Sequence, residues 1–226
     1  MTAIASIYTP EGFVIGADGR QLTYEMDSIE SDSATKIFGF AAENVRGAYA
    51  WTGSIRLTWG ASVFDFKNHS SEIVNELESE TSDSLKEYVV RFCLLIYEHL
   101  KSWIENSGAK FPVVDNPEMV RVRFVGFANG LPDMKSAYYP LNNGIWTAPG
   151  LGQVEPPIGK LNIFGGNEKV FLEMDEKGLI HACSTLAEGK ALVAGYIQAC
   201  ALVDGPTINT IGGHIYRNVR VGTKPT

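Results

Sequence analysis

After Met1 the chain reads Thr2-Ala-Ile-Ala-Ser-Ile-Tyr8 and, after a break at Thr9-Pro-Glu-Gly12, continues with Phe13-Val-Ile-Gly-Ala-Asp18. Both runs are rich in β-branched and aromatic residues, which favour strands. The break between them contains Pro and Gly, which favour turns. We therefore predict a β-hairpin with strands at 3–8 and 13–17, and Asp18 directly follows its second strand.

Further strands and two helices are expected after this hairpin. Strands are predicted at 35–40 and 47–52, and the composition of 55–80 favours a helix. Ser82 or Asp83 can cap a clearer helix that ends near residue 106, with Gly108 just beyond it. In this helix the apolar residues recur at helical spacing and predict a buried face: Leu85, Val89, Phe92, Leu95 and Ile96.

The second half of the chain repeats the order of strands, then helices, then a strand. The expected elements are strands at 119–127 and 134–139 joined through Asn129-Gly130, a surface loop at 142–160, a strand at 161–164, helices at 167–174 and 186–203, and a last strand at 214–221. The sequence contains no internal repeat and no linker. We therefore expect a single α+β domain over residues 1–226.

The composition excludes several classes of protein. Of the 226 residues, 45% are hydrophobic and 20% are charged, which is too apolar for a disordered chain. No stretch approaches the roughly 20 apolar residues of a membrane span. The net charge is −7 and no basic cluster is present, so nucleic-acid binding is not expected.

The cysteines and the N-terminal residues indicate a compartment. Cys93, Cys183 and Cys200 are odd in number, widely spaced and set among apolar residues, which predicts buried reduced thiols. The first residues lack the basic and then apolar order of a secretory signal. We therefore expect a cytoplasmic protein.

Two short motifs do not predict a cofactor or a metal. Gly150-Leu-Gly152 begins like a dinucleotide-binding loop, but the third glycine and the following helix are missing. The four histidines are scattered along the chain, and His181-Ala-Cys183 has no third donor at a suitable spacing. We expect neither a cofactor nor a metal site.

The strongest chemical signal lies at the second residue. Removal of Met1 ahead of a small residue would leave Thr2 with a free α-amine. Such an amine has a pKa of about 7.7–8.0, so it can accept the proton of the threonine hydroxyl at neutral pH. A threonine with this amine is a known type of activated nucleophile.

Three further blocks follow in order: Val14-Ile-Gly-Ala-Asp-Gly-Arg20, Ala34-Thr-Lys-Ile-Phe38 and Ala48-Tyr-Ala-Trp-Thr-Gly-Ser54. With Thr2 they resemble the β-type subunits of the proteasome and their bacterial homologues, which are N-terminal-nucleophile (Ntn) hydrolases. In that family an acidic residue lies sixteen positions after the threonine, as Asp18 does here, and an arginine follows two residues later, as Arg20 does. Lys36 matches the family lysine but lies slightly further from the threonine, as if two residues had been inserted within 21–33, and Gly53 matches the glycine whose amide faces the oxyanion.

The resemblance extends more weakly to the end of the chain. Phe124-Val-Gly-Phe-Ala-Asn-Gly130 resembles the mid-chain hairpin of the family, Ile163-Phe-Gly-Gly166 its Gly-Ser-Gly turn, and Thr210-Ile-Gly-Gly-His-Ile215 the lead into its late strand. The match implies a four-layer αββα sandwich. It also implies a homo-oligomer that hydrolyses peptides or unfolded proteins, while any ATP-dependent unfoldase partner stays unidentified.

The resemblance also implies a role for each matched residue. Thr2 would attack the peptide carbonyl and form an acyl-enzyme, and Lys36, held by Asp18, would lower the pKa of its hydroxyl and amine. The Gly53 amide would donate to the oxyanion. Supporting or substrate-binding positions would be Arg20, Leu22, Thr23 and Gly166, with the cleft bordered by residues 21–23 and those near Trp51.

The sequence departs from the family where polar residues should support the threonine amine. Gly166, Ile208 and Ile211 stand where the family has two serines and an aspartate, and the polar residues nearby that could substitute are Asp204, Thr207 and Thr210. Three alternatives therefore stay open. They are a catalytically inactive member of the fold, an Ntn amidase that acts on a small acyl amide, and a binding module unrelated to the family.

Overall fold

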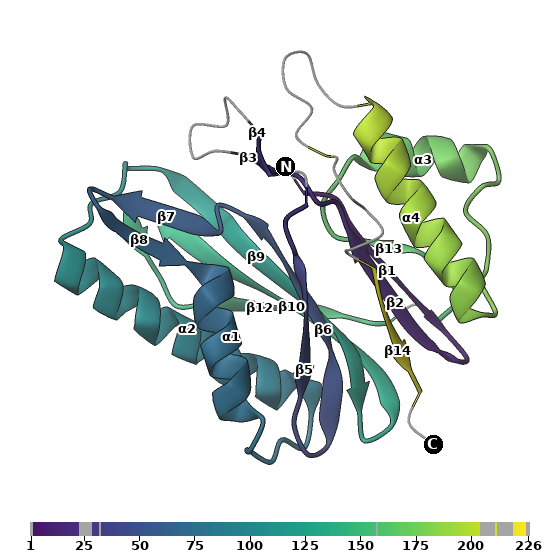
Figure 1. The fold of residues 1–226 in the computed structure, drawn as a ribbon, viewed down its shortest axis with the longest axis horizontal. Helices are drawn as coiled ribbons and strands as arrows, with labels where there is room; N and C mark the ends of the chain where they lie inside the picture. Colours follow the sequence, from purple (N-terminus) through teal and green to yellow (C-terminus); the bar gives the residue numbers. More distant parts are fainter. Residues whose placement is uncertain are drawn as a thin grey trace.

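The structure is a computed structural model that describes residues 2–22, 29–31, 33–156, 158–203, 211 and 219–224, with backbone alone at 21–22, 29–30, 115–118 and 153. It is a mixed α/β fold of antiparallel sheets and, in the described residues, four helices. Figure 1 shows two larger sheets, each with a pair of helices beside it.

The first sheet contains the predicted N-terminal hairpin. Its order is β13 (Asn162–Ile163), β1 (Ile4–Thr9), β2 (Gly12–Ala17) and β14 (Val219–Thr223), with every neighbouring pair antiparallel. The hairpin prediction is confirmed, with Ile4 opposite Ala17 and Thr9 opposite Gly12. Of the last strand predicted at 214–221, residues 214–218 lie outside the described residues, and β14 occupies the rest.

The second sheet is the larger one. Its order is β11 (Ile145–Trp146), β10 (Leu131–Asn142), β9 (Asp115–Ala128), β6 (Val45–Gly53) and β5 (Ile37–Ala41), and β12 (Gly150–Val154) also pairs with β10. Asn129 and Gly130 join β9 to β10 with φ of 49° and 76°, which suits the tight turn expected of Asn-Gly. The loop predicted at 142–160 is wrong in part, because β11 and β12 return along β10 and satisfy its edge.

The helix predicted over 55–80 is also wrong over residues 55–65. A two-stranded ladder occupies that part, β7 (Arg56–Trp59) and β8 (Ser62–Asp65), and turns at Gly60 with a φ of 57°. The helix α1 (Phe66–Leu77) starts only after Asp65, whose side chain accepts from the Lys67 amide. A second small ladder joins β3 (Gln21–Leu22) to β4 (Ile29–Ser31).

The other three helices agree with the sequence, apart from one cap. The helix α2 (Leu85–Ser107) is capped by Ser84 rather than Ser82 or Asp83, since the Ser84 hydroxyl accepts from the Glu87 amide. Gly108 ends this helix with a φ of 66°, in the left-handed conformation that favours glycine. The remaining helices are α3 (Glu168–Glu176) and α4 (Leu186–Val203).

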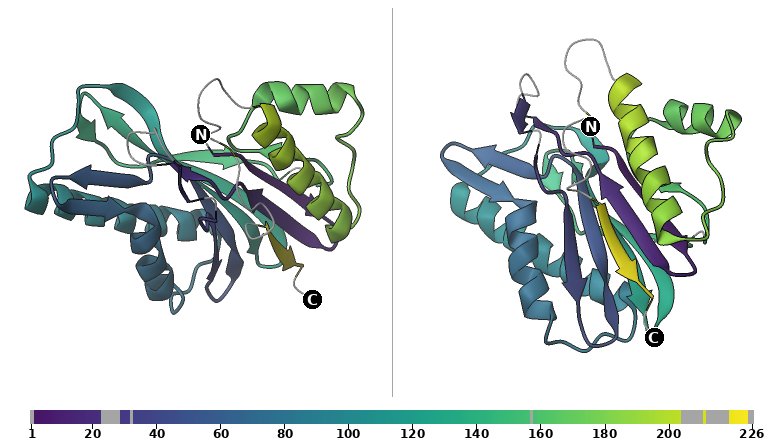
Figure 2. Two further views of the ribbon diagram at one scale, coloured as in Figure 1. Left: turned by 45° about the horizontal axis from the view of Figure 1, so that its top comes forward. Right: turned by 45° about the vertical axis from the view of Figure 1, so that its right-hand side comes forward.

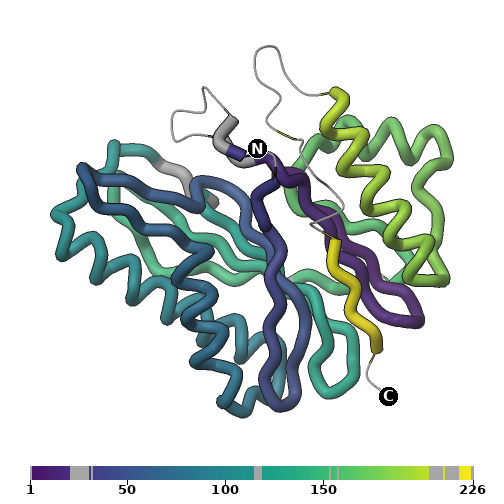
Figure 3. Tube along the Cα trace, viewed as in Figure 1, coloured from purple at the N-terminus to yellow at the C-terminus, as the bar shows by residue number. Residues whose placement is uncertain are grey.

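Three hydrophobic clusters hold these elements together. One joins α1 and α2 to the second sheet through residues such as Phe92, Phe124 and Tyr139. Another joins α3 and α4 to β1 and β2 and includes Ile7 of β1 and Val193 of α4. A third combines residues of both sheets: Ile4, Tyr8, Phe13, Ile15, Ala17, Ile37, Ala48, Ala50, Val125, Phe127, Met134 and Phe164. β1 and β2 run between α4 and the second sheet, as seen in two further views (Figure 2) and in a tube drawing of the chain (Figure 3).

Two sequence expectations concern α4 and the cysteines. Among the described helices α4 is the one that is long and apolar enough to span a membrane. Its apolar composition is explained by packing on β1 and β2, where Val193, Tyr196 and Ile197 are buried. The three cysteines are buried and outside any disulfide, as expected.

Candidate active site

The hairpin of β1 and β2 brings Asp18 to the start of the chain. Antiparallel pairing sets Ile4 opposite Ala17, so Asp18 comes to lie beside Ala3. The Asp18 amide donates to the Ala3 carbonyl at 3.1 Å, and the Ala3 amide donates to Asp18 Oδ1 at 3.0 Å. The Asp18 side chain is fully buried and is therefore fixed next to Thr2 by backbone pairing.

Lys36 joins this pair from the residue before β5. Its Nζ lies 3.0 Å from Asp18 Oδ2 and donates to Thr2 Oγ1 at 3.4 Å. The backbone amide of Arg20 also donates to Asp18 Oδ2, at 3.2 Å. The structure thus brings together Thr2, Asp18 and Lys36, which are predicted site residues from three separate segments.

The charge of Lys36 is set by opposing effects. Burial lowers the pKa of Lys36 from its ordinary value, and the nearby carboxylate of Asp18 raises it in opposition. The positive charges of Lys67 and Arg20 lower the pKa further. A cation that donates to Thr2 Oγ1 stabilises negative charge on that oxygen, which is the charge a nucleophilic hydroxyl develops when it attacks.

Gly53 lies at the end of β6 in a conformation reserved for glycine. Its φ is 95°, and an added Cβ would collide with the Met119 carbonyl oxygen. The residue before it, Thr52, is buried, and its Oγ1 lies near Gly165. Trp51 points the other way, into the cluster under α1 and α2, where its Nε1 donates to Ser70 at 3.0 Å. Successive side chains of a strand alternate, so Trp51 and Thr52 lie on opposite faces of β6, and the expectation that residues near Trp51 border the cleft stays a prediction.

Gly165 is a site residue that the sequence analysis did not single out. Its φ is 95°, and an added Cβ would lie 2.5 Å from the Thr2 carbonyl oxygen and 3.8 Å from Thr52 Oγ1. The preceding Phe164 amide donates to the Ile4 carbonyl at 2.8 Å, which ties this turn to β1. The Gly165-Gly166 pair was the available signal, since adjacent glycines permit such a close backbone approach.

Tyr196, on α4, supports the same turn and was also missed. Its hydroxyl donates to the Gly165 carbonyl at 3.3 Å. Burial raises the pKa of Tyr196, so it remains a protonated donor. At Gly166 an added Cβ would lie 2.6 Å from Tyr196 Oη and 3.3 Å from Ala3 Cβ. Gly166 therefore faces Ala3 rather than Thr2.

The other predicted site residues are placed only in part. Leu22 lies in β3 by its backbone alone, and Thr23 lies outside the described residues. The candidates for amine support, Asp204, Thr207 and Thr210, also lie outside them, as does Ile208. Ile211 is buried in the cluster under α4.

Sequence comparison and structure comparison give different results for this chain. No protein-family model and no curated protein sequence matches it. Among solved structures, the Anbu complex of Pseudomonas aeruginosa, described as a helical assembly, is 12% identical with a TM-score of 0.62 and covers 99% of this chain and 82% of its own. Anbu of Yersinia bercovieri, described as an ancestral β-subunit, is 10% identical with a TM-score of 0.62 and covers 99% and 81%.

A third similar structure is shorter than Anbu. BPH of Thiobacillus denitrificans, solved in complex with epoxomicin, is 12% identical with a TM-score of 0.54 and covers 100% of both chains. At such identities the likeness concerns the fold alone. The chain therefore has a proteasome-like fold, in agreement with the resemblance of its N-terminal blocks.

Proposed function

We propose that this chain is a threonine-type peptide hydrolase in which Thr2, freed by removal of Met1, is the nucleophile. The single observation that carries the proposal is the cluster of Thr2 Oγ1, Lys36 Nζ and Asp18 Oδ2, joined at 3.4 and 3.0 Å. A buried lysine and aspartate beside an N-terminal threonine supply the charges that this chemistry needs. The proteasome-like fold is consistent with the proposal.

The reaction would proceed in two halves. Thr2 Oγ attacks the carbonyl carbon of the peptide while its proton passes to the α-amine of the same residue, directly or through one water. The tetrahedral intermediate collapses, the amine returns this proton to the leaving nitrogen, and an ester joins Thr2 to the acyl half. Water then attacks the ester in the same way, which releases the acid and restores Thr2.

The neighbouring residues would act on charge and position. Lys36 stays cationic through Asp18 and stabilises the attacking oxygen, while Asp18 is held by the amides of Ala3 and Arg20. The Gly53 amide is the proposed donor to the oxyanion, a contribution of about 3–4 kcal/mol for one donor in other enzymes. Leu22 and Thr23 keep their proposed supporting roles around the cleft, and Gly166 would act only through Ala3, the residue after Thr2.

We also propose an order of layers, an oligomeric state and a location for this chain. We expect residues 1–226 to form one domain with four layers, α1 and α2, the second sheet, the first sheet, and α3 and α4. The three hydrophobic clusters support this order, because each joins two successive layers. We further propose a homo-oligomer, as the Anbu complex of Pseudomonas aeruginosa is a helical assembly. A cytoplasmic location suits the three buried thiols.

One observation favours the alternative of an inactive structural member. Gly166, where the family places a supporting serine, offers no side chain, and its surroundings are the Tyr196 hydroxyl and Ala3. An inactive member would retain the fold and the Lys36–Asp18 pair but hydrolyse nothing. An Ntn amidase would turn over a small acyl amide and leave extended peptides intact.

The deciding experiment begins with the intact mass of the untagged protein. A mass that lacks one methionine, with turnover of fluorogenic peptides that Thr2→Ala abolishes and Thr58→Ala retains, supports the proposal; Thr58 is an exposed threonine of β7. A free Thr2 with no peptide turnover contradicts it, and turnover of small amides alone would identify the amidase. Epoxomicin is a second probe, and we expect a covalent adduct on the wild type that Thr2→Ala does not form.

A further inference from the structure

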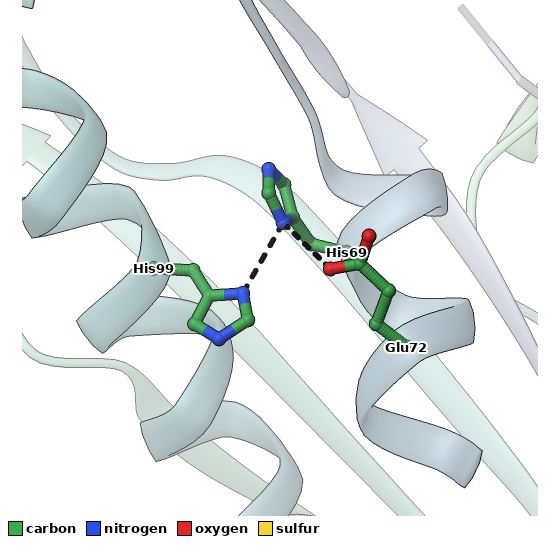
Figure 4. A group of neighbouring side chains, drawn as sticks. All are labelled: His69, Glu72 and His99. Atoms are coloured by element: carbon green, nitrogen blue, oxygen red, sulfur yellow. Dashed lines mark hydrogen bonds and ion pairs between the residues drawn. The ribbon is translucent and has the colours of Figure 1, made fainter. Parts of the chain in front are cut away.

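Two histidines and a glutamate converge where α1 meets α2. His69 and Glu72 lie one turn apart on α1, and His99 lies on α2 (Figure 4). His69 Nδ1 is 3.2 Å from His99 Nδ1 and 3.4 Å from Glu72 Oε2. Among the described residues these three form the one group of this kind whose ligand atoms all lie within 4.8 Å of one another.

These separations match the edges of a tetrahedral coordination shell. Zinc binds histidine nitrogen at about 2.0–2.1 Å and carboxylate oxygen at about 2.0–2.2 Å, so two ligands of one tetrahedral zinc lie about 3.3–3.4 Å apart. His69 lies 3.2 Å from His99 and 3.4 Å from Glu72, and all three ligand atoms lie within 4.8 Å of one another, so a small adjustment of the side chains would admit the ion between them.

We propose that His69, Glu72 and His99 bind a divalent transition metal, with zinc as the best match. Two imidazoles and one carboxylate form a donor set that zinc favours. The site is accessible, because the side chains of His69 and Glu72 are 29% and 67% exposed. No step of the peptide hydrolysis involves this site.

The surroundings of His69 orient its ring for binding. The Phe64 ring stacks on the His69 ring at 4.3 Å with an interplanar angle of 20°. Phe64 is fully buried and also packs against Phe66 of α1 and Trp103 of α2, so the ring that supports His69 is fixed from both helices. Such packing reduces the side-chain entropy that His69 loses when it coordinates an ion.

The proposed metal would cross-link the helices α1 and α2. It would link residues 69 and 72 to residue 99, on helices that cover the second sheet, whereas Thr2 precedes β1 of the first sheet. A ligand that binds only the folded state stabilises that state. The metal is therefore expected to raise the thermal stability without changing the hydrolytic site.

The test is to titrate the metal-free protein with zinc chloride and to measure binding by calorimetry. The midpoint of thermal unfolding is then compared with and without zinc. We expect one zinc per chain and a rise of the unfolding midpoint by about 5 °C at saturating zinc. With cobalt in place of zinc, the tetrahedral site gives an intense visible absorption band. His99→Gln removes binding and the band, and Glu72→Gln, at an exposed position, weakens binding at least tenfold.

Two matched variants separate the site from nonspecific binding. His181→Gln removes an exposed histidine elsewhere, and Glu76→Gln removes an exposed glutamate one turn further along α1; both retain the zinc affinity. Absence of stoichiometric zinc binding to the wild type overturns the proposal and leaves a direct hydrogen bond between the two imidazoles. Equal binding by wild type and Glu72→Gln, which is expected to fold normally, overturns it as well.

Discussion

Lys36 Nζ lies 3.0 Å from Asp18 Oδ2, in an ion pair whose side chains are 5% and 0% exposed. Removing two charges from water is costly, and the cost is recovered only when the partners and their hydrogen bonds are well placed. Here the backbone amides of Ala3 and Arg20 also donate to the carboxylate. The pair therefore links the electrostatics of the proposed nucleophile to the stability of the first sheet.

Comparison of Asp18→Asn with a double variant separates these two roles. Asp18→Asn removes the charge that keeps Lys36 protonated in a buried position, so we expect a loss of about 3–5 kcal/mol in the free energy of unfolding and a loss of peptide turnover. The double variant Asp18→Asn/Lys36→Met buries no charge at this pair and should recover most of the stability but none of the activity. Denaturant unfolding and peptide assays measure both.

The matched control is an exposed ion pair. Arg91 and Glu80 lie 3.2 Å apart with side chains 56% and 38% exposed, so Glu80→Gln should cost less than about 1 kcal/mol. If Asp18→Asn cost no more than Glu80→Gln, the buried pair would not be a determinant of stability.

The pH dependence of activity should report Lys36. Burial lowers its pKa from the ordinary value of 10.5, so the charge beside Thr2 is lost at a lower pH than for an exposed lysine. We therefore expect kcat/KM to fall, as the pH is raised, already at a pH below 10.5. Lys36→Arg keeps its charge in this range, so any activity it retains should lack this alkaline fall.

The lowered pKa of Lys36 also makes the free energy of unfolding depend on pH. Between the lowered folded-state pKa and 10.5 the unfolded chain holds the Lys36 proton more tightly than the folded chain. The contribution of Lys36 to the free energy of unfolding therefore rises with pH across this window. Comparison of the wild type with Lys36→Met across the window isolates it, and a flat or opposite difference would contradict the lowered pKa.

Gly165→Ala should damage the site more than the fold. An added Cβ would lie 2.5 Å from the Thr2 carbonyl oxygen at a φ of 95°, so Thr2 must shift. A displacement of about 1 Å costs on the order of 10²-fold in rate, which is the loss we expect in kcat/KM. Gly178→Ala, at a φ of 67° with open space around it, carries the backbone strain of about 1–2 kcal/mol without the collision and should leave kcat/KM unchanged.

The sequence predicts the parts of this fold that depend on local signals. The N-terminal hairpin, the Asn129-Gly130 turn and the helix at 186–203 each have a clear local pattern, and each is confirmed. The ladder β7–β8 was missed, because a short segment of mixed composition fits a helix or a strand until its partner strand is known. The same holds for β11 and β12, which are strands only because β10 is beside them.

Only those residues of the candidate site that belong to recognisable sequence blocks could be predicted. Thr2, Asp18 and Lys36 could be selected through the resemblance of their sequence blocks to the β-type subunits of the proteasome, and the structure places them together. Tyr196 could not be selected, since a tyrosine on the buried face of a helix is ordinarily core. The pairing of His69 with His99 is likewise absent from the sequence, because the packing of α1 on α2 creates it.

Tyr196→Phe tests whether the α4 hydroxyl positions the turn that contacts Thr2. The variant keeps the ring and removes the donor to the Gly165 carbonyl, so we expect a loss of about 1 kcal/mol in the free energy of unfolding. Because Gly165 touches the Thr2 backbone, kcat should also fall several-fold while KM changes little.

The control for this variant is Tyr139→Phe. The Tyr139 hydroxyl donates to the Cys93 carbonyl at 3.2 Å and is equally buried, but it lies in the cluster under α2 rather than near β1. The two variants should lose similar stability, and only Tyr196→Phe should lose activity. Equal kcat values for both variants would show that Tyr196 serves the core of the first sheet and does not position Thr2.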